Sequence, residues 1–365
     1  MLDGAGPWGT GPYKLVEGFS LPDKRSDRVV LEANLAYWDK TRRPRLHRII
    51  FDNTLAQDDA VELIKSGEGR VDLVTDLRPL DTLRVAQSPF AQVVKARGAL
   101  QSVFGQFNMR KTGSPWQDLR LRQAVNYAIN RADLIRYAAK GNGVVIPALV
   151  PVQGFGHNPD LAPYPFDPST ARQLLREAGY ADGLSLTLIA PDALEVQATV
   201  ISKMLQQVGF KLERQILSPV AYNQQTMMDR LNRPAEEQPW DLALISWNNA
   251  PNFPIYHLYH RFALDGERDW VLEHSELRRL YAQALRTVDR PRQEALIRQM
   301  ERHIRNQASF LFLYNPINLY AVNEAVAFVP YVNGMLQLAE TSMTEQHWSM
   351  RREQETIHRP EKGKE

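Results

Sequence analysis

The sequence predicts an α/β protein in which mixed sheets are flanked by helices, and three patterns indicate this class. From about residue 100, short apolar runs typical of strands alternate with segments whose apolar residues recur at helical spacing. Residues 167–179 carry the clearest helix signal. Residues 184–216 predict a strand, a helix and a second strand, a unit that pairs its strands in parallel through a right-handed crossover.

The first hundred residues predict a smaller α/β unit. Residues 9–38 contain a Gly/Pro turn followed by two strands that form a hairpin, and residues 46–51 predict a third strand. Asp58 and Asp59 are expected to cap a helix over residues 60–66, after which residues 71–74 form a strand.

Residues 101–143 predict a strand followed by two helices. The strand covers residues 101–107, and apolar residues at helical spacing between positions 119 and 129 predict the first helix. Asn130 and Asp133 form a capping box that starts the second helix, and Gly141 ends it.

The rest of the chain continues the alternation. The helix after Asp167 has an N-cap residue, a proline at its first position and Gly179 at its end. Trp240–Ser246 is a short apolar run bounded by prolines, which favours a central strand. The remaining expected elements are strands at 184–190, 210–216, 309–314 and 319–322 and helices at 192–209, 219–231, 275–288 and 291–306.

Composition excludes several classes of function. With 44 basic and 42 acidic side chains the formal charge is +2, so no basic excess points to nucleic-acid binding. The absence of cysteine excludes disulfides, Cys-ligated zinc and a thiol nucleophile. No apolar run is long enough for a membrane helix, and Met1–Gly6 lacks the features of a signal peptide.

Motifs for catalysis are weak, so the sequence predicts no catalytic residues, no metal site and no cofactor. Gly9-Thr10-Gly11 has Lys14 where a dinucleotide loop needs glycine, and neither a P-loop nor a G-x-S-x-G motif is present. His257 and His260 could share one helical face, but no third ligand is evident, so they are interpreted as part of an aromatic segment near a cleft. Adjacent carboxylates such as Asp58-Asp59 are interpreted as caps.

Four arginines, Arg120, Arg122, Arg131 and Arg136, follow the helical spacing of residues 118–136. We interpret them as a solvated face with local ion pairs, with an anion or partner surface as the alternative. Trp247 is a separate case, because it ends the predicted central strand and begins an Asn/Pro loop. Open α/β sheets bind ligands at such strand ends.

Several motifs in a fixed order resemble the extracytoplasmic solute-binding proteins of family 5, the peptide, nickel and opine receptors of ABC importers. The similar segment extends from about residue 7 to residue 345. The motifs that carry the resemblance are Gly9-Thr10-Gly11-Pro12-Tyr13, Glu32-Ala33-Asn34 with Tyr37-Trp38, Ser66-Gly67-Glu68 with Val71-Asp72, Phe107-Asn108, Pro115-Trp116-Gln117-Asp118, Arg122-Gln123-Ala124, and Phe166-Asp167-Pro168 with Glu177-Ala178-Gly179.

The resemblance implies a type II periplasmic-binding-protein fold, whose two lobes close on a ligand. Residues 1–100 would be a remnant of lobe one, to which residues 312–350 return, and residues 101–311 would form lobe two. The tail 351–365 is expected to be disordered. Because the Gly-Thr-Gly-Pro turn lies well inside the family's chains, the resemblance also implies that the first lobe is incomplete.

The resemblance places the ligand at the loop 247–254. The expected ligand-binding residues are Trp247, Asn248, Asn249, Ala250, Pro251, Asn252, Phe253 and, in lobe two, Asn108. Peptide-binding members commonly carry an aspartate in this loop, whereas every residue from Trp247 to Phe253 is neutral here. Recognition of a free α-amine by an ion pair is therefore in doubt.

The leading hypothesis is a monomeric, non-enzymatic carrier that binds a peptide, opine or similar small solute and delivers it to an ABC transporter permease. The resemblance implies a periplasmic or cell-surface location, with a cytoplasmic fragment as the alternative. A second hypothesis is a degenerate interaction or regulatory module that retains the lobe without transport.

Overall fold

The computed structural model describes residues 10–19, 26–228, 237–249, 252–264, 268–272 and 275–351, with the backbone alone at 227–228. The chain divides into two compact units. Unit 1 comprises Met1–Arg97, Asn318–Tyr331 and Met335–Glu365, and unit 2 comprises Gly98–Ile317 and Val332–Gly334. Of the predicted tail at 351–365, residues 352–365 fall outside the described residues, and so do residues 229–231 of the predicted helix 219–231.

Unit 2 is built on a six-stranded mixed sheet with the order β7-β11-β6-β10-β8-β9. Strands β8 and β9 pair in parallel over their whole length, as the β-α-β pattern predicts, and β10 pairs in parallel with β8 but antiparallel with β6. The strands are β6 (Gln101–Phe107), β7 (Gly143–Val145), β8 (Leu184–Pro191), β9 (Phe210–Leu217), β10 (Leu242–Asn248) and β11 (Phe310–Pro316).

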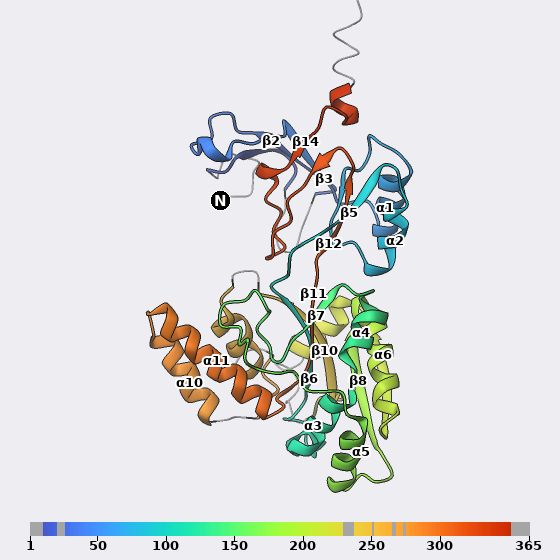
Figure 1. The fold of residues 1–365 in the computed structure, drawn as a ribbon, viewed down its shortest axis with the longest axis vertical. Coiled ribbons are helices and arrows are strands. Elements are labelled where there is room, and N and C mark those ends of the chain that lie inside the picture. The colour runs from blue at the N-terminus through green and yellow to red at the C-terminus, as the bar shows by residue number, and fades with distance from the viewer. Residues whose placement is uncertain are drawn as a thin grey trace, which may run out of the picture. The chain divides into compact units, whose positions relative to one another are not determined.

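Helices cover both faces of this sheet (Figure 1), which confirms the predicted α/β class. Figure 1 shows α3, α4, α5 and α6 on one side and the pair α10–α11 on the other. The helical elements are α3 (Leu119–Ala128), α4 (Arg131–Ala138), α5 (Pro168–Glu177), α6 (Glu195–Gln206), α7 (Pro219–Asn223), a π-helical turn η7 (Ile255–His260) that continues into α9 (Arg261–Ala263), α10 (Ser275–Arg286) and α11 (Arg290–Asn306).

Two of the predicted helix starts are confirmed by side chains that cap them. Asp167 accepts hydrogen bonds from the backbone N–H groups of Ser169 and Thr170, and Asn130 accepts one from Asp133. The predicted cap of the first helix is wrong. Helix α1 (Gln57–Ser66) begins after Ala56, which makes no side-chain cap, so Asp58 and Asp59 lie in the first turn, where their charges favour the helix dipole.

Unit 1 contains two three-stranded sheets, with the orders β1-β2-β3 and β4-β12-β5. The first contains the predicted hairpin, in which β1 and β2 are antiparallel. The elements are β1 (Tyr13–Glu17), β2 (Arg28–Ala33), β3 (Arg48–Asp52), β4 (Leu73–Val74), α2 (Thr82–Ala86), β5 (Ala91–Lys95), β12 (Leu319–Asn323) and the β13–β14 pair (Val326–Ala327 and Ser342–Met343).

The predicted return to the first unit at residue 312 comes too early. Residues 310–316 form β11, which pairs with both β6 and β7, so this strand belongs to the sheet of unit 2. The chain enters unit 1 at Asn318. Residues 332–334 then rejoin unit 2, where Val332 accepts a hydrogen bond from the backbone N–H of Leu100 at 2.8 Å.

Two of the four arginines do not form a solvated face, which corrects the sequence interpretation. Arg122 and Arg131 are buried and donate to backbone carbonyl groups. Arg131 alone donates to the carbonyl oxygens of Phe312, Asn126, Ile129 and Tyr164. Burial lowers the pKa of Arg131 to about 10, so it remains charged at neutral pH. Arg120 behaves as predicted, because it is exposed and paired with Asp118.

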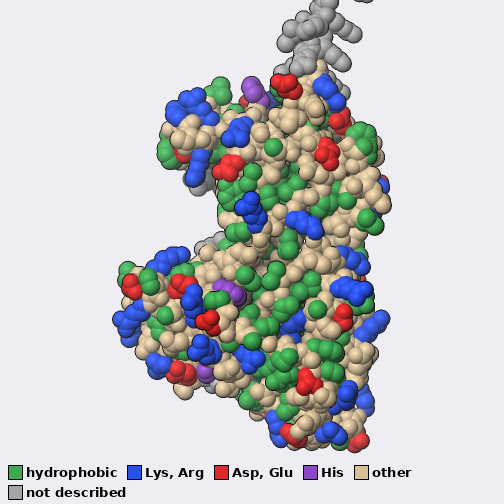
Figure 2. Space-filling model, viewed as in Figure 1, with side chains coloured by type: hydrophobic (Ala, Val, Ile, Leu, Met, Phe, Trp, Pro, Cys, Tyr) green, Lys and Arg blue, Asp and Glu red, His purple; other side chains and the backbone are tan. Residues whose placement is uncertain are grey.

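A solvated charged face is found instead on the helical pair α10–α11. Figure 2 shows basic side chains, which are arginines in these helices, interspersed with acidic ones. Arg279 pairs with Glu276 at 2.7 Å and Arg298 with Glu294 at 2.8 Å, one helical turn apart in each case.

Candidate functional site

The candidate site lies at the carboxyl end of β10, where the half-buried Trp247 follows the buried run Leu242–Ile245. The indole ring of Trp247 is half-buried and meets Phe262 edge-on, with 5.2 Å between the ring centroids. The guanidinium carbons of Arg261 and Arg268 lie 4.8 and 5.6 Å from the Trp247 ring centroid. The indole therefore has cations near it as well as an aromatic neighbour.

Asn249 fixes the backbone of the loop. Its N–H donates to the carbonyl of Leu100 at 2.6 Å, which ties the loop to the start of β6. Its side-chain oxygen accepts from the N–H of Phe253 at 3.3 Å, and its carbonyl accepts from Asn252 at 2.7 Å. These bonds connect Asn249 to Asn252, to Phe253 and to the residue before β6.

Asn252 links this loop to the segment that follows β7. It adopts a φ of 53°, a left-handed conformation that asparagine tolerates better than most residues. Its side-chain oxygen accepts from the backbone N–H of Phe155 at 2.7 Å. Phe253, the next residue, exposes 41% of its surface.

Asn248 is exposed and extends the site toward the segment that rejoins unit 2. Its Nδ2 donates to the carbonyl of Asn333 at 3.3 Å. The structure thus brings Trp247, Asn248, Asn249, Asn252 and Phe253 together at one strand end. Phe155 and Asn333 are not among the residues expected from the sequence, because no local pattern places either of them beside β10.

Asn108 does not share this location. In the antiparallel pair of β6 and β10, Gln101 lies opposite Asn248 and Phe107 opposite Leu242, so Asn108 is at the far end, roughly 20 Å from Trp247 at strand rise. Asn108 is fully buried, donates to the carbonyl of Trp240 and accepts from the N–H of Lys111. Its side chain holds a turn, so we leave it out of the proposed site.

A buried carboxyl group, also missed from the sequence, joins two elements beside the loop. Glu301 on α11 accepts from the Tyr259 hydroxyl on η7 and from the backbone N–H of Val150 at 3.1 Å. Glu301 is fully buried. Burial raises the pKa of Glu301 to about 7, although the hydrogen bonds from Tyr259 and Val150 oppose this shift.

The two histidines of the sequence analysis lie on η7. His260 stacks between Tyr256 and Tyr281, with centroid distances of 5.1 and 6.2 Å. Burial lowers the pKa of His257, and the charge of Arg261 lowers it further. Across the described ranges, no cluster of three His, Cys, Asp or Glu side chains is arranged to hold a metal ion.

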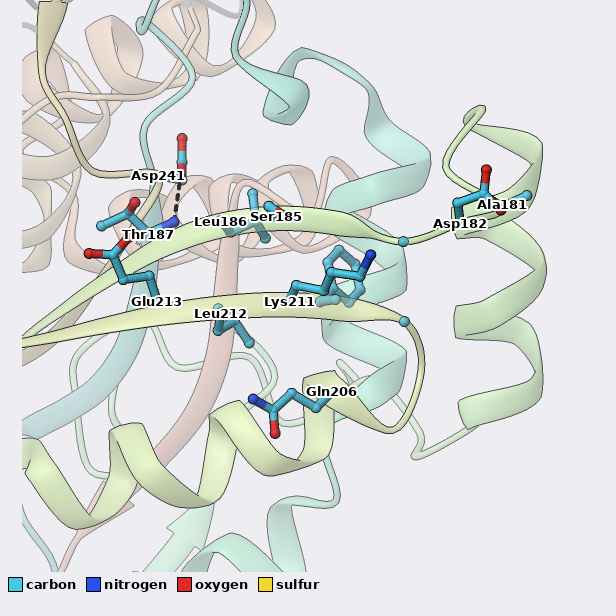
Figure 3. A pocket seen from close by; sticks show the side chains of 13 residues that line it. Ala181, Asp182, Ser185, Leu186, Thr187, Gln206, Lys211, Leu212, Glu213 and Asp241 are labelled. Carbon is cyan, nitrogen blue, oxygen red and sulfur yellow. Dashed lines mark hydrogen bonds between the residues drawn. The ribbon is translucent and has the colours of Figure 1, made fainter.

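A shallow depression of about 790 Å³ lies elsewhere in unit 2, over the first residues of β8 and β9. Figure 3 shows Thr187 and Glu213 on neighbouring strands there, with Asp241 beside them. Asp241 already accepts from Lys111 and from the N–H of Thr187. We favour the end of β10, because ligands of open α/β sheets bind at the carboxyl ends of strands, whereas this depression lies at the amino ends.

Comparison with known proteins gives one family. Residues 3–267 match bacterial extracellular solute-binding proteins, family 5, middle region. The dipeptide-binding protein of Escherichia coli K12 is 29% identical over 184 residues, which are 50% of this chain and 32% of that protein. The glutathione-binding protein GsiB of Pectobacterium atrosepticum is 26% identical over 330 residues, which are 84% of this chain and 58% of GsiB.

Solved structures show the same two-lobed fold. The periplasmic binding protein DppA from Helicobacter pylori, in complex with the peptide STSA, aligns with a TM-score of 0.73 at 19% identity, covering 92% of this chain and 63% of DppA. NikA from Brucella suis, in complex with Fe(III)-EDTA, aligns with a TM-score of 0.76 at 18% identity, covering 92% and 68%. The chain therefore spans from a third to about two thirds of these relatives.

Proposed function

Because the chain belongs to the bacterial extracellular solute-binding proteins of family 5, we propose that it binds a small polar, peptide-like solute for an ABC importer. The proposed solute-facing residues are Trp247, Asn248, Asn249, Asn252 and Phe253. Ala250 and Pro251, which lie outside the described residues, complete the loop in the sequence.

One observation carries this proposal: three chain segments meet the loop at the carboxyl end of a central strand. Leu100 accepts from Asn249, the N–H of Phe155 donates to Asn252, and Asn333 accepts from Asn248. These contacts hold a loop that is rich in amide groups, while the partly exposed rings of Trp247 and Phe253 offer apolar contact. This combination suits a small solute with both polar and apolar parts.

The names of the relatives support a peptide-like solute. They include dipeptide-binding and glutathione-binding proteins, and three of the similar solved structures hold a peptide. We infer that this chain acts as a monomeric carrier outside the cytoplasm and hands its solute to a membrane permease. Over the described residues, no helix is both long and apolar enough to cross a bilayer.

We also infer that the chain is a carrier and not an enzyme. An acid/base pair needs two ionisable groups held across a cleft at a fixed distance. Among the described residues of the loop, the side chains are amide or aromatic groups, which bind but do not transfer protons at neutral pH.

Isothermal titration calorimetry with dipeptides, tripeptides, opines and sugars tests this proposal. We expect micromolar binding of at least one peptide-like solute, and a loss of at least tenfold in affinity for Trp247→Ala. Trp38→Ala is the matched control, because Trp38 is 69% exposed and lies in unit 1. Absence of binding to every solute at millimolar concentration, in protein that melts cooperatively, would contradict the proposal and favour an interaction module.

A further inference from the structure

The connection between β2 and β3 in unit 1 is strongly basic. Residues 34–48, which join the two strands and include the first residue of β3, contain five basic side chains and a single carboxylate, that of Asp39. We call residues 34–48 the basic loop. Figure 2 shows Lys and Arg side chains gathered over this loop, which is the blue connection beside β2 in Figure 1. All five basic side chains are exposed: Lys40, Arg42, Arg43, Arg45 and Arg48.

Only part of this positive charge is balanced within the protein. Arg48 pairs with Glu32 at 2.5 Å, and Arg42 lies 3.9 Å from Asp39. The remaining basic side chains form no ion pair with any carboxylate among the described residues, and they are Lys40, Arg43 and Arg45. Exposed cations without such partners favour contact with an anionic surface.

The three cations without ion pairs are close together because the chain between them is short. A chain spans at most about 3.6 Å per residue, so the Cα atoms of Arg43 and Arg45 are no more than about 7 Å apart. By the same limit, those of Lys40 and Arg43 are no more than about 11 Å apart. These distances are comparable with the Debye length of about 8 Å at physiological salt, so an anionic surface attracts the three charges together.

Two large apolar side chains of the same loop are open to solvent. Leu35 is 84% exposed and Trp38 is 69% exposed. The ring of Tyr37 contacts the Trp38 indole, with 5.5 Å between the ring centroids. Tryptophan together with lysine and arginine is typical of a membrane–water interface, where the indole lies at the level of the headgroups and the cations meet phosphates.

An acidic protein surface has the same charge but suits the basic loop less well. A protein interface fixes each long side chain in one geometry and so removes its rotamer freedom. A fluid lipid surface supplies phosphates wherever the side chains reach, so cations that are not held by ion pairs keep more of that freedom. The observations therefore favour a lipid surface.

We propose that the basic loop attaches this protein to anionic phospholipid surfaces, with Lys40, Arg43 and Arg45 bound to headgroup phosphates and Trp38 at the interface. The loop belongs to unit 1, whereas the proposed solute-facing residues belong to unit 2, so this is a second binding activity. A carrier held at the bilayer stays close to the permease, but the attachment itself does not depend on the solute.

Flotation with lipid vesicles tests the attachment. We expect at least tenfold stronger partition into vesicles of equal parts phosphatidylglycerol and phosphatidylcholine than into vesicles of phosphatidylcholine alone. Raising the salt to about 0.5 M should weaken the partition at least tenfold, because the Debye length becomes shorter than the loop. Equal partition into the two kinds of vesicle would overturn the proposal.

A triple variant tests the three cations. Lys40→Gln/Arg43→Gln/Arg45→Gln should weaken partition into the anionic vesicles at least tenfold, because each Lys or Arg near such a surface adds to binding. All three side chains are exposed, so the variant should fold, and its melting curve verifies this. Partition within threefold of the wild type would contradict the proposal.

The matched control removes three exposed cations from α5 and α6 of unit 2. Arg172→Gln/Arg176→Gln/Lys203→Gln lowers the formal net charge of +2 by the same three units and should change partition by less than threefold. If the two triple variants lose binding equally, overall charge and not the basic loop governs attachment, and the proposal is wrong.

Two further measurements separate lipid from acidic protein. Phospholipids brominated in their acyl chains should quench the fluorescence of the wild type, and Trp38→Phe should remove at least half of this quenching, since Trp38 lies at the interface. Unchanged quenching would contradict that position of the indole. Soluble polyglutamate represents an acidic protein surface. If it binds the wild type more tightly than the anionic vesicles do, and the loop variant loses that binding, the partner is an acidic protein and the lipid proposal is wrong.

Discussion

Unit 2 contains nearly all of the largest fully buried side chains, whereas in unit 1 a group of ion pairs links α1 and α2. The largest fully buried side chains belong to unit 2, among them Trp116, Phe104 and Phe310, and unit 1 contributes Ile64 to this group. Phe104 meets both Phe262 and Phe310 edge-on. Such aromatic contacts in a central sheet tolerate little change in volume.

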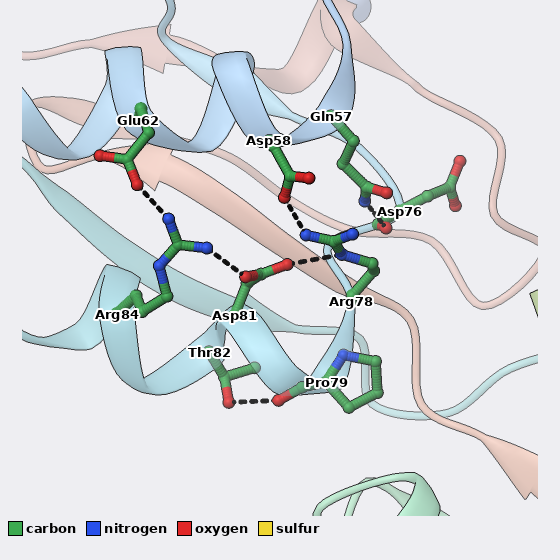
Figure 4. A network of polar contacts seen from close by, with 9 residues as sticks. All are labelled: Gln57, Asp58, Glu62, Asp76, Arg78, Pro79, Asp81, Thr82 and Arg84. Atoms are coloured by element: carbon green, nitrogen blue, oxygen red, sulfur yellow. Dashed lines mark hydrogen bonds and ion pairs between the residues drawn. The ribbon is translucent and has the colours of Figure 1, made fainter. Parts of the chain in front are cut away.

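In unit 1, Asp81 connects α1 and α2 through two arginines, as Figure 4 shows. Arg78 and Arg84 each donate to Asp81 at 2.7 Å, and they also pair with Asp58 and Glu62 of α1. A buried cluster of Tyr320, Val322, Val326 and Phe328 packs elsewhere in this unit.

The difference also concerns how buried charge is compensated. The buried Arg131 of unit 2 is held by neutral carbonyl groups, while the buried Asp81 of unit 1 is held by cations. The two units should therefore respond differently to substitution, pH and salt. Hydrogen exchange measured by mass spectrometry can follow peptides from each unit separately.

The largest effect is expected for Arg131→Met. This change leaves several buried carbonyl groups without a donor, so peptides of unit 2 should lose about 4 kcal/mol of protection, with unit 1 little affected. Arg120→Met is the control, because Arg120 is exposed on the preceding helix, and it should cost less than about 1 kcal/mol. A loss of similar size for both variants would show that the carbonyl contacts of Arg131 are not decisive.

The next effect concerns Glu301 and pH. Its pKa is raised from 4.5 to about 7 in the folded protein, so the folded state binds the proton more tightly. The stability that this group contributes is full below about pH 4.5 and is lost as pH rises through about 7. Relative to Glu301→Gln, the wild type should lose up to about 3 kcal/mol in unit 2 over this interval.

Chemical denaturation at several pH values measures this difference. Glu294→Gln serves as the control, because Glu294 is on the same helix and pairs with Arg298 at its surface. The stability difference between the wild type and Glu294→Gln should show no comparable dependence on pH. If the free energies of unfolding of the wild type and of Glu301→Gln change in parallel between about pH 4.5 and 7.5, the raised pKa of Glu301 is contradicted.

A smaller effect of opposite sign is expected for Asp81 in unit 1. Burial raises the pKa of Asp81, but the hydrogen bonds from Arg78 and Arg84 outweigh burial and leave the pKa below its ordinary value. Its contribution is therefore present above about pH 4 and is lost in acid. Asp81→Asn should cost about 2 kcal/mol in unit 1 at neutral pH, and 1 M salt should reduce that cost.

Asp58→Asn is the matched control for this network. The Asp58 side chain is 66% exposed, whereas that of Asp81 is 5% exposed, so the control should cost less than about 0.5 kcal/mol. If both substitutions cost the same, burial of Asp81 adds nothing to the network. If lowering the pH reduces hydrogen-exchange protection in unit 2 before it does so in unit 1, the proposed difference between the two units is wrong.

Much of the fold could be predicted because it depends on local patterns. The cap at Asp167, the capping box at Asn130 and the apolar run of β10 each predict an element that the structure contains. The N-cap expected at Asp58 and Asp59 was placed too late in the sequence, because the helix already begins at Gln57. Carboxylates are favourable at several positions near a helix start, so their presence does not fix the first residue. The motifs in their order were specific enough to indicate the family, which the match over residues 3–267 confirms.

The candidate site was predicted in part. Trp247 and its loop follow from the end of a buried strand, which is a local signal. Phe155, Asn333 and Glu301 approach the loop or its neighbours from segments far away in sequence, and no spacing links them to Trp247. Asn108 was expected beside Trp247, but β6 and β10 are antiparallel, so the end of β6 lies away from the end of β10. The sequence of a strand does not reveal whether its neighbour in the sheet is parallel or antiparallel.

The amino-acid order alone thus specified the α/β elements, the family and the neutral character of the loop after Trp247, because these depend on near neighbours and residue type. Tertiary packing decided which polar groups are buried and which partners they meet. Arg131 and Arg120 are of one residue type on consecutive helices, yet one is buried among carbonyls and the other is exposed. Arg131 donates to the carbonyl group of Phe312 on β11, a strand that comes much later in the chain, so the residues around Arg131 do not reveal its burial.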